Sequence, residues 1–409
     1  MHSVKGNALV LVVSEPLFAI PHTMFSGYVT LYMLELGVTK PQVGMITSLG
    51  LFVHLFFALI SAYVTDKYGR RYTTLIFDTV GWCGSFFLWA IAQNIYYFIA
   101  AAIMNAFFRI VMNSFHCLML EDSPVESRIH IFNFMQVASI LAGFFAPLGA
   151  LLINRMTLVP AMRGMLMFTT IWMGLLFIVR HFFVKETAVG RQKIQEMKGV
   201  RLIDVFKAYI PVLRRMFQNK LLIIALLIRS LNFIQFTIRG TFLAVLVTER
   251  LGFPSEIMAL FYTINAVMML LVLVFVTPVL AQITRRWPIS LGICFHISAT
   301  LVLLLSPPTQ NFFLLIAAAV LIALGTSITA PRIDTLVANT IVNEDRSVAN
   351  AVINVILLLL STPFGFIGGI LADIDPRLPF ILTFMVFIVC LLLMFYAERV
   401  DKKLAAEAG

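Results

Sequence analysis

The stretch DKYGRR, residues 66–71, stands between two long apolar runs, and a second basic turn, QITRR at 282–286, begins 216 residues later. PLG at 147–149 recurs at the same offset of 216 as PFG at 363–365. A membrane chain built from two like halves usually keeps its substrate site at the interface between them. The repeat therefore predicts a transporter with two pseudo-symmetric halves.

The composition excludes a soluble globular protein. Hydrophobic residues make up 60% of the 409 residues and charged residues 12%, whereas charged residues are about 25% of an ordinary soluble chain. Apolar runs of about 20 residues recur along the chain, each long enough to cross a bilayer core of about 30 Å. Backbone polar groups in a bilayer have to be paired internally, so these runs predict helices. The expected fold is an all-α membrane protein with twelve transmembrane helices in two six-helix bundles.

The twelve predicted spans follow the apolar runs, and Gly37 and Gly252 precede corresponding runs in the two halves. Their limits are 8–36, 41–64, 72–92, 95–120, 129–153, 163–184, 221–248, 254–281, 288–306, 311–341, 347–372 and 378–397.

The net charge of +10 follows membrane topology rather than nucleic-acid binding. If both termini lie on one side, 20 of the 30 Lys and Arg residues fall in segments on that side and five on the other. Such a bias marks the cytoplasmic side. We therefore expect a multi-pass protein of the cell inner membrane with both termini in the cytoplasm and no nucleic-acid partner.

The longest polar stretch, Lys185 to Lys220, separates the halves. The predicted domains are a first bundle at 1–184, a cytoplasmic linker at 185–220 and a second bundle at 221–409. Apolar residues at helical spacing between Leu202 and Phe217 predict an amphipathic helix on the membrane surface, which Pro211 should kink or divide. An extended basic tether is the alternative.

The first basic turn carries a family resemblance. Ala62 to Arg71 resembles the signature Gly-x-x-x-Asp-Arg/Lys-x-Gly-Arg-Arg/Lys that lies between spans two and three of the major facilitator superfamily, with Ala62 where the family has Gly. Twelve spans in two halves and a basic central loop agree with it. The resemblance implies a secondary transporter, similar in some features to drug/proton antiporters.

The resemblance also implies a conformational gate. It comprises Asp66, Lys67, Gly69, Arg70 and, at the end of span four, Glu121. Asp66 and Arg70 would latch the two halves together when the cytoplasmic side is closed, and Gly69 would permit the tight reversal. Because the sequence places Asp66 and Arg70 in a loop rather than in the core, we expect their replacement to impair transport and leave expression largely intact.

Arg109 in span four matches the intramembrane arginine of proton-coupled antiporters. Asn105 and Arg109 are four residues apart on one helical face. Ala142, Ala146-Pro147 and Ala150 resemble a small-residue version of the antiporter motif Gly-x-x-x-Gly-Pro-x-x-Gly. This favours export.

Polar side chains on one face of several other spans predict the substrate cavity. They are Arg229, Asn232, Phe236 and Arg239 in span seven, Tyr262 and Asn265 in span eight, and Asn350 and Asn354 in span eleven. The excess of arginine hints at an anionic or zwitterionic solute, whereas the Phe-rich and Met-rich spans also suit an amphiphilic one.

Proton coupling is predicted at Glu15, Asp334 and, as a further proton carrier, His22. At about 1.5 Å of rise per residue, Glu15 and Asp334 lie roughly 10 Å, Arg229 roughly 12 Å and Arg109 roughly 15 Å from the cytoplasmic side. These four residues could form one ion network. An intramembrane charge usually faces a cavity or a partner.

Other functional classes are less consistent with the chain. A membrane enzyme would need a nucleophile with a base or a metal cluster, and the sequence shows neither pattern. We expect no cofactor, no metal and a monomer in the lipid bilayer. The alternatives kept open are a proton-coupled or facilitative transporter of an organic anion or other metabolite, including uptake, and a non-transporting membrane sensor.

Overall fold

The computed structural model describes residues 4–281, 283, 287–339 and 346–408, which form helices and no strand. In the first half the helices are α1 (Gly6–Ser26), α2 (Val29–Glu35), α3 (Lys40–Tyr68), α4 (Arg70–Asp78), η1 (Thr79–Gly84), α5 (Ser85–Ala90), α6 (Ile95–Asn105), α7 (Phe108–Leu120), α8 (Val125–Ala142), η2 (Gly143–Phe145), α9 (Ala146–Met156) and α10 (Leu158–Phe183).

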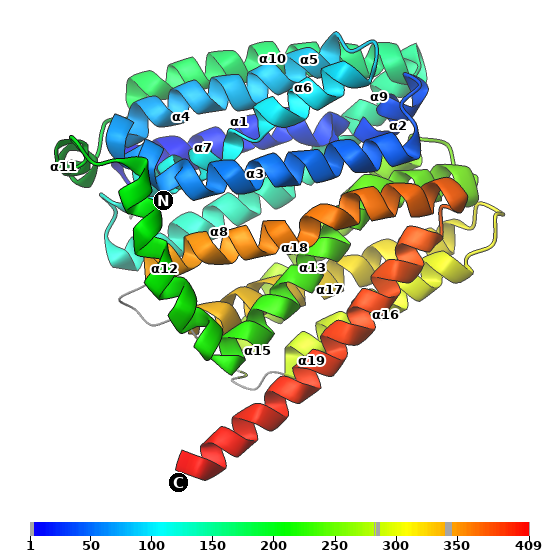
Figure 1. The fold of residues 1–409 in the computed structure, drawn as a ribbon. Coiled ribbons are helices and arrows are strands. Elements are labelled where there is room, and N and C mark those ends of the chain that lie inside the picture. Colours follow the sequence, from blue (N-terminus) through cyan, green and yellow to red (C-terminus); the bar gives the residue numbers. More distant parts are fainter. Residues whose placement is uncertain (1–3, 282, 284–286, 340–345, 409) are drawn as a thin grey trace.

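The linker and second half contain α11 (Ala188–Glu196), α12 (Leu202–Gln218), α13 (Lys220–Val245), η3 (Leu246–Arg250), α14 (Ile257–Leu271), η4 (Val272–Val276), α15 (Thr277–Ala281), α16 (Trp287–Leu305), α17 (Phe312–Asn339), α18 (Arg346–Ile374) and α19 (Leu378–Ala408). Figure 1 shows the helices of the first half above those of the second, with α3 and α18 side by side where the halves meet.

The predicted all-α membrane fold is confirmed. By length and composition, eleven helical stretches of the described chain can cross a membrane. The span predicted at 72–92 is the exception, although α4, η1 and α5 make it helical from Arg70 to Ala90. Asp78 and the other polar and glycine residues of this stretch lower its mean hydropathy. The stretch is therefore helical, but its composition is less apolar than that of the eleven candidate spans.

The outer surface of the bundle suits lipid. On α10, Phe168, Ile171, Leu175 and Ile178 are each at least half exposed and recur at helical spacing. Large apolar side chains in such a row would be costly in water, because an exposed apolar patch has no partner there. A bilayer removes that cost.

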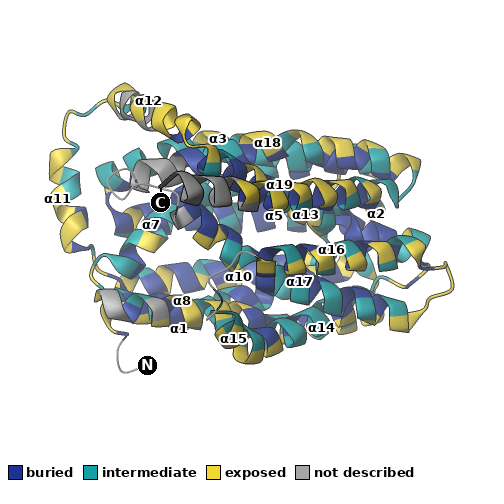
Figure 2. Ribbon diagram, turned by 90° about the horizontal axis from the view of Figure 1, so that it is seen from below, coloured by how far each residue is buried: buried dark blue, intermediate teal, exposed yellow. Residues whose placement is uncertain are grey.

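The chain ends, α11 and α12 lie on one side of the bundle, which we call the terminal face (Figures 1 and 2). The turn at Tyr68–Arg71 belongs to it. The side that holds the turns at Gly37 and Gly252 is the opposite face. Both of these glycines have positive φ, 80° and 75°, which costs little only without a Cβ. Equivalent turns of the two halves therefore use the same backbone device.

The helix predicted between Leu202 and Phe217 is present as α12. Pro211 lies inside α12 without dividing it, because one missing backbone donor removes only one of the bonds of a 17-residue helix. The segment before it is not a plain tether, since α11 is a separate helix that packs on α3. Helix α12 contacts α3 of the first half and α13 and α18 of the second, and those of its side chains that the structure describes are mostly exposed (Figure 2).

The halves are packed tightly near the opposite face. A Cβ on Gly44 of α3 would lie 2.4 Å from the Gly365 carbonyl oxygen and 2.9 Å from the Cα of Gly369, both on α18. Ser48 donates to the Thr362 carbonyl (2.5 Å) and accepts from the Phe366 amide (2.7 Å). Small residues are what allow two helix backbones to approach this closely in a membrane.

Candidate functional site

A cavity of about 300 Å³ lies between the two halves. Its lining comes from α1, α8, η2 and α9 of the first half and from α14 of the second. The residues are Thr23, Ser26, Gln136, Ser139, Ile140, Gly143, Ala146, Tyr262, Asn265, Ala266 and Met269. The volume is at the lower end of the roughly 300–1,000 Å³ of ligand pockets. Apolar walls with a few polar groups are also typical of such pockets.

Contacts between the halves accumulate beside the cavity, towards the opposite face. Gly143 of η2 packs on Ala266 of α14, where a Cβ would lie 2.6 Å from the alanine methyl group. Further out, Thr30 donates to the Thr241 carbonyl (2.7 Å). Helix α9 packs on α14 as well. Gly143 and Ala266 themselves line the cavity, so the contacts further out, such as Thr30 with Thr241, separate it from the opposite face.

An ion pair joins the halves at the opposite face. Lys40 at the start of α3 bonds Glu249 in η3, with Nζ 2.5 Å from Oε2. The contacts that the structure describes between the halves thus place a closed layer between the cavity and the opposite face.

The predicted substrate-binding residues reach the cavity unevenly. Tyr262 and Asn265 line it, and Asn265 also donates to the Ala319 carbonyl on α17 (3.2 Å). Arg239 lies close to Tyr262 and lines a small internal space together with His296 and other residues of the second half. These residues form one polar region of the second half.

The other predicted residues of α13 and α18 lie elsewhere. Asn232 accepts a bond from Gln235 (3.3 Å), and Phe236 is 57% exposed and stacks on Phe233. Asn354 is partly exposed on α18. The side chain of Asn350 lies outside the part of the chain whose side chains are described.

Arg109 and Asn105 are together, but their neighbour is His54 rather than an acid. His54 of α3 lies beside both of them. The Nε of Arg109 is buried without a hydrogen-bond partner in the structure. An unpartnered buried guanidinium nitrogen is costly, so this position suits a ligand or a change of conformation.

The four residues expected to form one ion network are distributed over three places. Asp334 on α17 pairs with Arg229 on α13, with Nη2 3.1 Å from Oδ1. Glu15 on α1 accepts a bond from Ser139 on α8 (3.1 Å). Arg109 belongs to the His54 group. The halves therefore hold separate charge clusters, because α1 and α7 direct these side chains into the first half and α13 and α17 direct theirs into the second.

His22 occupies an aromatic pocket. Its ring centroid lies 5.8 Å from that of Trp82 and 5.4 Å from that of Phe25, and Phe18 and Phe86 complete the surroundings. His22, predicted as a proton carrier, is therefore surrounded by aromatic rings of the first half and is not among the residues that line the cavity.

The sequence analysis missed a buried ion pair. Asp78 at the end of α4 bonds Arg180 of α10, and their side chains are 4% and 7% exposed. The guanidinium carbon of Arg180 also lies 4.9 Å from the ring centroid of Phe177. Both charges act on Glu15. The charge of Asp78 within an apolar run was the available signal, since an intramembrane carboxylate usually has a partner.

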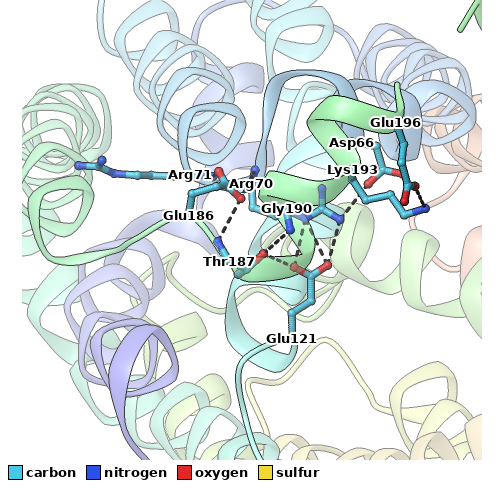
Figure 3. A network of polar contacts seen from close by, with 9 residues as sticks. All are labelled: Asp66, Arg70, Arg71, Glu121, Glu186, Thr187, Gly190, Lys193 and Glu196. Atoms are coloured by element: carbon cyan, nitrogen blue, oxygen red, sulfur yellow. Dashed lines mark hydrogen bonds and ion pairs between the residues drawn. The ribbon is translucent and has the colours of Figure 1, made fainter. Parts of the chain in front are cut away.

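Three of the predicted gate residues, Asp66, Arg70 and Glu121, form a compact cluster at the terminal face (Figure 3). Arg70 bonds Asp66 (Nη2 to Oδ1, 2.9 Å) and forks onto Glu121, with Nη2 3.0 Å and Nε 3.2 Å from Oε1. Gly69 has φ +87°, so the reversal from α3 to α4 needs glycine. Lys67 points elsewhere and donates to the Tyr63 hydroxyl (2.7 Å).

The linker completes this cluster. Glu186 accepts from the backbone amides of Arg70 (3.1 Å) and Arg71 (2.9 Å), so a distant carboxylate caps the first turn of α4. Thr187 donates to Glu121 and caps α11 by accepting from the Gly190 amide. In this conformation Asp66, Arg70 and Glu121 bond one another, and the segment that follows α10 adds bonds to Glu121 and to the first turn of α4, whereas Nη1 of Arg70 is buried without a hydrogen-bond partner.

The loop placement of Asp66 and Arg70 is corrected by these contacts. Asp66 lies in the last turn of α3, and Arg70 is the first residue of α4 and only 2% exposed. Removal of a buried cation with two carboxylate partners leaves both acids without it, which costs more than a change in a solvated loop. Replacement of Arg70 should therefore affect stability as well as transport.

We expect Arg70→Ala to abolish transport in proteoliposomes and to lower the melting temperature in detergent. Asp66→Asn should impair transport with a smaller loss of stability, because it leaves the Arg70–Glu121 fork intact. Lys67→Ala is the matched control, since Lys67 contacts only tyrosines in the described network. Unchanged transport in both gate variants would remove the gate assignment.

Comparisons with known proteins identify the family and the fold. The family model described as Major Facilitator Superfamily matches residues 17–357 and 226–409. The nucleoside transporter NupG has a TM-score of 0.72 at 13% identity, over 97% of this chain and 100% of that one. A POT family transporter in complex with a thioalcohol-conjugated peptide has 0.70 at 14% identity, over 96% of each chain.

The human organic anion transporter MFSD10 is more distant in shape, with a TM-score of 0.63 at 13% identity over 95% of this chain and 98% of that one. At these identities the solved structures show the fold alone. No curated protein sequence matches significantly. The family model, by contrast, extends from residue 17 to the end of the chain and confirms the resemblance seen in DKYGRR. The chain belongs to the major facilitator superfamily and is a membrane transporter of a small solute.

Proposed function

We propose that the protein is a secondary active transporter that exchanges a small organic solute for protons by alternating access. The observation that carries this proposal is the cavity between the halves, with a layer of contacts on one side of it. A site at the interface of two repeats is reached from either side as the repeats rock against each other. The domains at 1–184 and 221–409 are the proposed moving bodies.

The orientation follows from the charges. The terminal face carries most of the Lys and Arg residues outside the spans, so it is the proposed cytoplasmic side of the inner membrane. The closed layer at the opposite face then makes this conformation inward-facing. Export remains our proposed direction, because Ala142, Ala146-Pro147 and Ala150 resemble the antiporter motif. A monomer holds both halves of the cavity and is the proposed functional unit.

Proton coupling is proposed at two acids of different halves. Glu15 lies behind the cavity in the first half, and Asp334 is 62% exposed beside Arg229 in the second. An acid that can lose or regain its basic partner as the halves move changes its proton affinity with conformation. His22 is the third candidate, and its aromatic surroundings separate it from the cavity lining.

The solute is proposed to be uncharged. The described lining of the cavity contains hydroxyl and amide groups but no charged side chain. Two intramembrane arginines, Arg180 and Arg229, are already paired with acids, and Arg332 donates to backbone carbonyls. An organic anion is the alternative, because Arg239 lies beside the cavity residue Tyr262.

The test uses proteoliposomes that contain a pH-sensitive dye. We expect a transported solute to drive proton movement in the wild type, and an imposed pH gradient to drive solute movement. Glu15→Gln or Asp334→Asn should remove the response to the gradient and preserve counterflow of labelled solute, which needs no net proton movement. A wild type that ignores the gradient would contradict proton coupling and leave facilitated diffusion as the better description.

A further inference from the structure

Ser139 of α8 joins the cavity to the carboxylate of Glu15. Its side chain lines the cavity, and its Oγ donates to Glu15 Oε1 at 3.1 Å. Glu15 is partly buried behind it on α1. Two charged groups of the first half act on the Glu15 carboxylate, Arg180 of α10 and Asp78 of α4, and they bond each other. Ser139 is thus the polar link between a solute in the cavity and this acid.

The single hydrogen of the hydroxyl makes this link directional. An ionised carboxylate only accepts hydrogen bonds, so it takes the hydrogen of Ser139 and leaves the oxygen lone pairs facing the cavity. A protonated carboxyl carries its own hydrogen and can donate it to Ser139 Oγ. The serine hydrogen is then free to point into the cavity. When Glu15 is ionised, the Ser139 hydroxyl can only accept a hydrogen bond from a bound solute. When Glu15 is protonated, the same hydroxyl can donate one to the solute.

The neighbouring lining is rich in acceptors as well. The single hydroxyl hydrogen of Thr23 is used within the protein, because the carbonyls of Ile20 and Ala142 both lie 2.9 Å from Oγ1 and can accept it, so the oxygen offers lone pairs to the cavity. One amide hydrogen of Asn265 is used by the Ala319 carbonyl. With Glu15 ionised, Ser139 and Thr23 therefore both present acceptors to a solute that donates hydrogen bonds. Hydroxyl groups supply such donors without a charge, which this lining could not neutralise.

We propose that the cavity binds an uncharged, hydroxyl-bearing solute and that Ser139 makes this binding antagonistic to protonation of Glu15. Linkage is reciprocal, so the proton weakens solute binding by the same factor as the solute weakens proton binding. Competition of this kind is what exchange of solute for protons requires. The inference rests on the proposed transport function and names the residue that performs its coupling.

The first experiment observes Glu15 without any solute. In wild-type protein, infrared spectroscopy follows the protonated carboxyl band that Glu15→Gln removes. Ser139→Ala should shift the pH at which half of Glu15 is protonated upward by about one unit, because the ionised form loses its donor. Ser139→Thr keeps a hydroxyl and should restore the wild-type value. Ser26→Ala, a cavity residue on α1, is the control and should leave it unchanged.

The second experiment measures binding with defined probes. Uridine and glucose are the uncharged probes, uridine 5′-monophosphate and gluconate are their charged counterparts, and 2′,3′,5′-tri-O-methyluridine lacks the ribose donors. We expect at least one uncharged probe to bind roughly tenfold more tightly at high pH than at low pH, the factor that one pH unit of linkage gives. Ser139→Ala should abolish that dependence, and the tri-O-methyl compound should bind weakly at both pH values.

Each result that differs from these expectations would overturn one named part of the proposal. Preference for the charged probes, or no binding of either uncharged probe, would overturn the solute class. An unchanged Glu15 titration in Ser139→Ala would overturn the coupling role. If Ser139→Ala shifts the titration as expected but the wild type ignores a pH gradient in proteoliposomes, the proposed proton exchange fails and the link between Ser139 and Glu15 stands.

Discussion

Asp78→Asn and Arg180→Met are each expected to lower the free energy of unfolding by about 3–5 kcal/mol, the cost of leaving one member of a buried ion pair without the other. Both side chains are less than a tenth exposed, so water cannot replace the lost partner. The measurement is unfolding by SDS in mixed micelles, followed by the fluorescence of the tryptophans.

The double variant Asp78→Leu/Arg180→Met distinguishes pairing from packing. It removes both charges together, and apolar replacements of buried pairs are often neutral or stabilising. We expect it to recover most of the stability lost in either single variant. Lys193→Ala is the control, because Lys193 and Glu196 are 43% and 44% exposed and such a pair contributes only about 0.2–1 kcal/mol. Single variants that resemble this control would show that the pair is solvated.

Gly44→Ala is expected to shift the conformational equilibrium towards opening of the opposite face. Its Cβ would collide with backbone atoms of Gly365 and Gly369, which no rotamer change can move. Spin labels at Gln93 and Thr309, exposed positions near the opposite face in the two halves, should report a longer distance in the variant. A nearly complete reversal of a two-state population needs about 5.5 kcal/mol, so a smaller clash gives a mixture of both distances.

Gly50→Ala is the matched control on the same helix. Its Cβ would meet only the methyl group of Ala102, at an ordinary 3.8 Å. It should leave the distance distribution unchanged and preserve transport. A wild-type-like distribution in Gly44→Ala would contradict the idea that α3 and α18 separate near the opposite face during transport.

The sequence was sufficient for the fold because its two strongest signals are local. Apolar length fixes where helices cross the bilayer, and the signature at 66–71 identifies the family that arranges them. The contacts of Arg70 with Asp66 and Glu121 were predictable for the same reason, since Asp66 and Arg70 are one helical turn apart and Glu121 occupies a family position, and their role as a gate stays a prediction.

Partners between distant helices were harder to predict. Sequence spacing gives the face of a helix, but which neighbour covers that face depends on tilt and packing. Glu15 and Arg109 were assigned to one network from their depths, whereas α8 supplies the partner of the first and α3 the neighbour of the second. The same limit explains why the pairing of Asp78 with Arg180, 102 residues away, was missed.

The bonds between the linker and the predicted gate residues limit how far the two halves can move apart. Because Glu186 and Thr187 bond the start of α4 and Glu121, α11 moves with the first half. The chain that remains between α11 and α12 without helical structure is the segment 197–201, in which Gly199 has φ +84°. Five extended residues reach at most about 18 Å. This short segment therefore limits the distance between α11 and the start of α12. If the two halves move further apart than it allows, α12 has to detach from the helices it contacts.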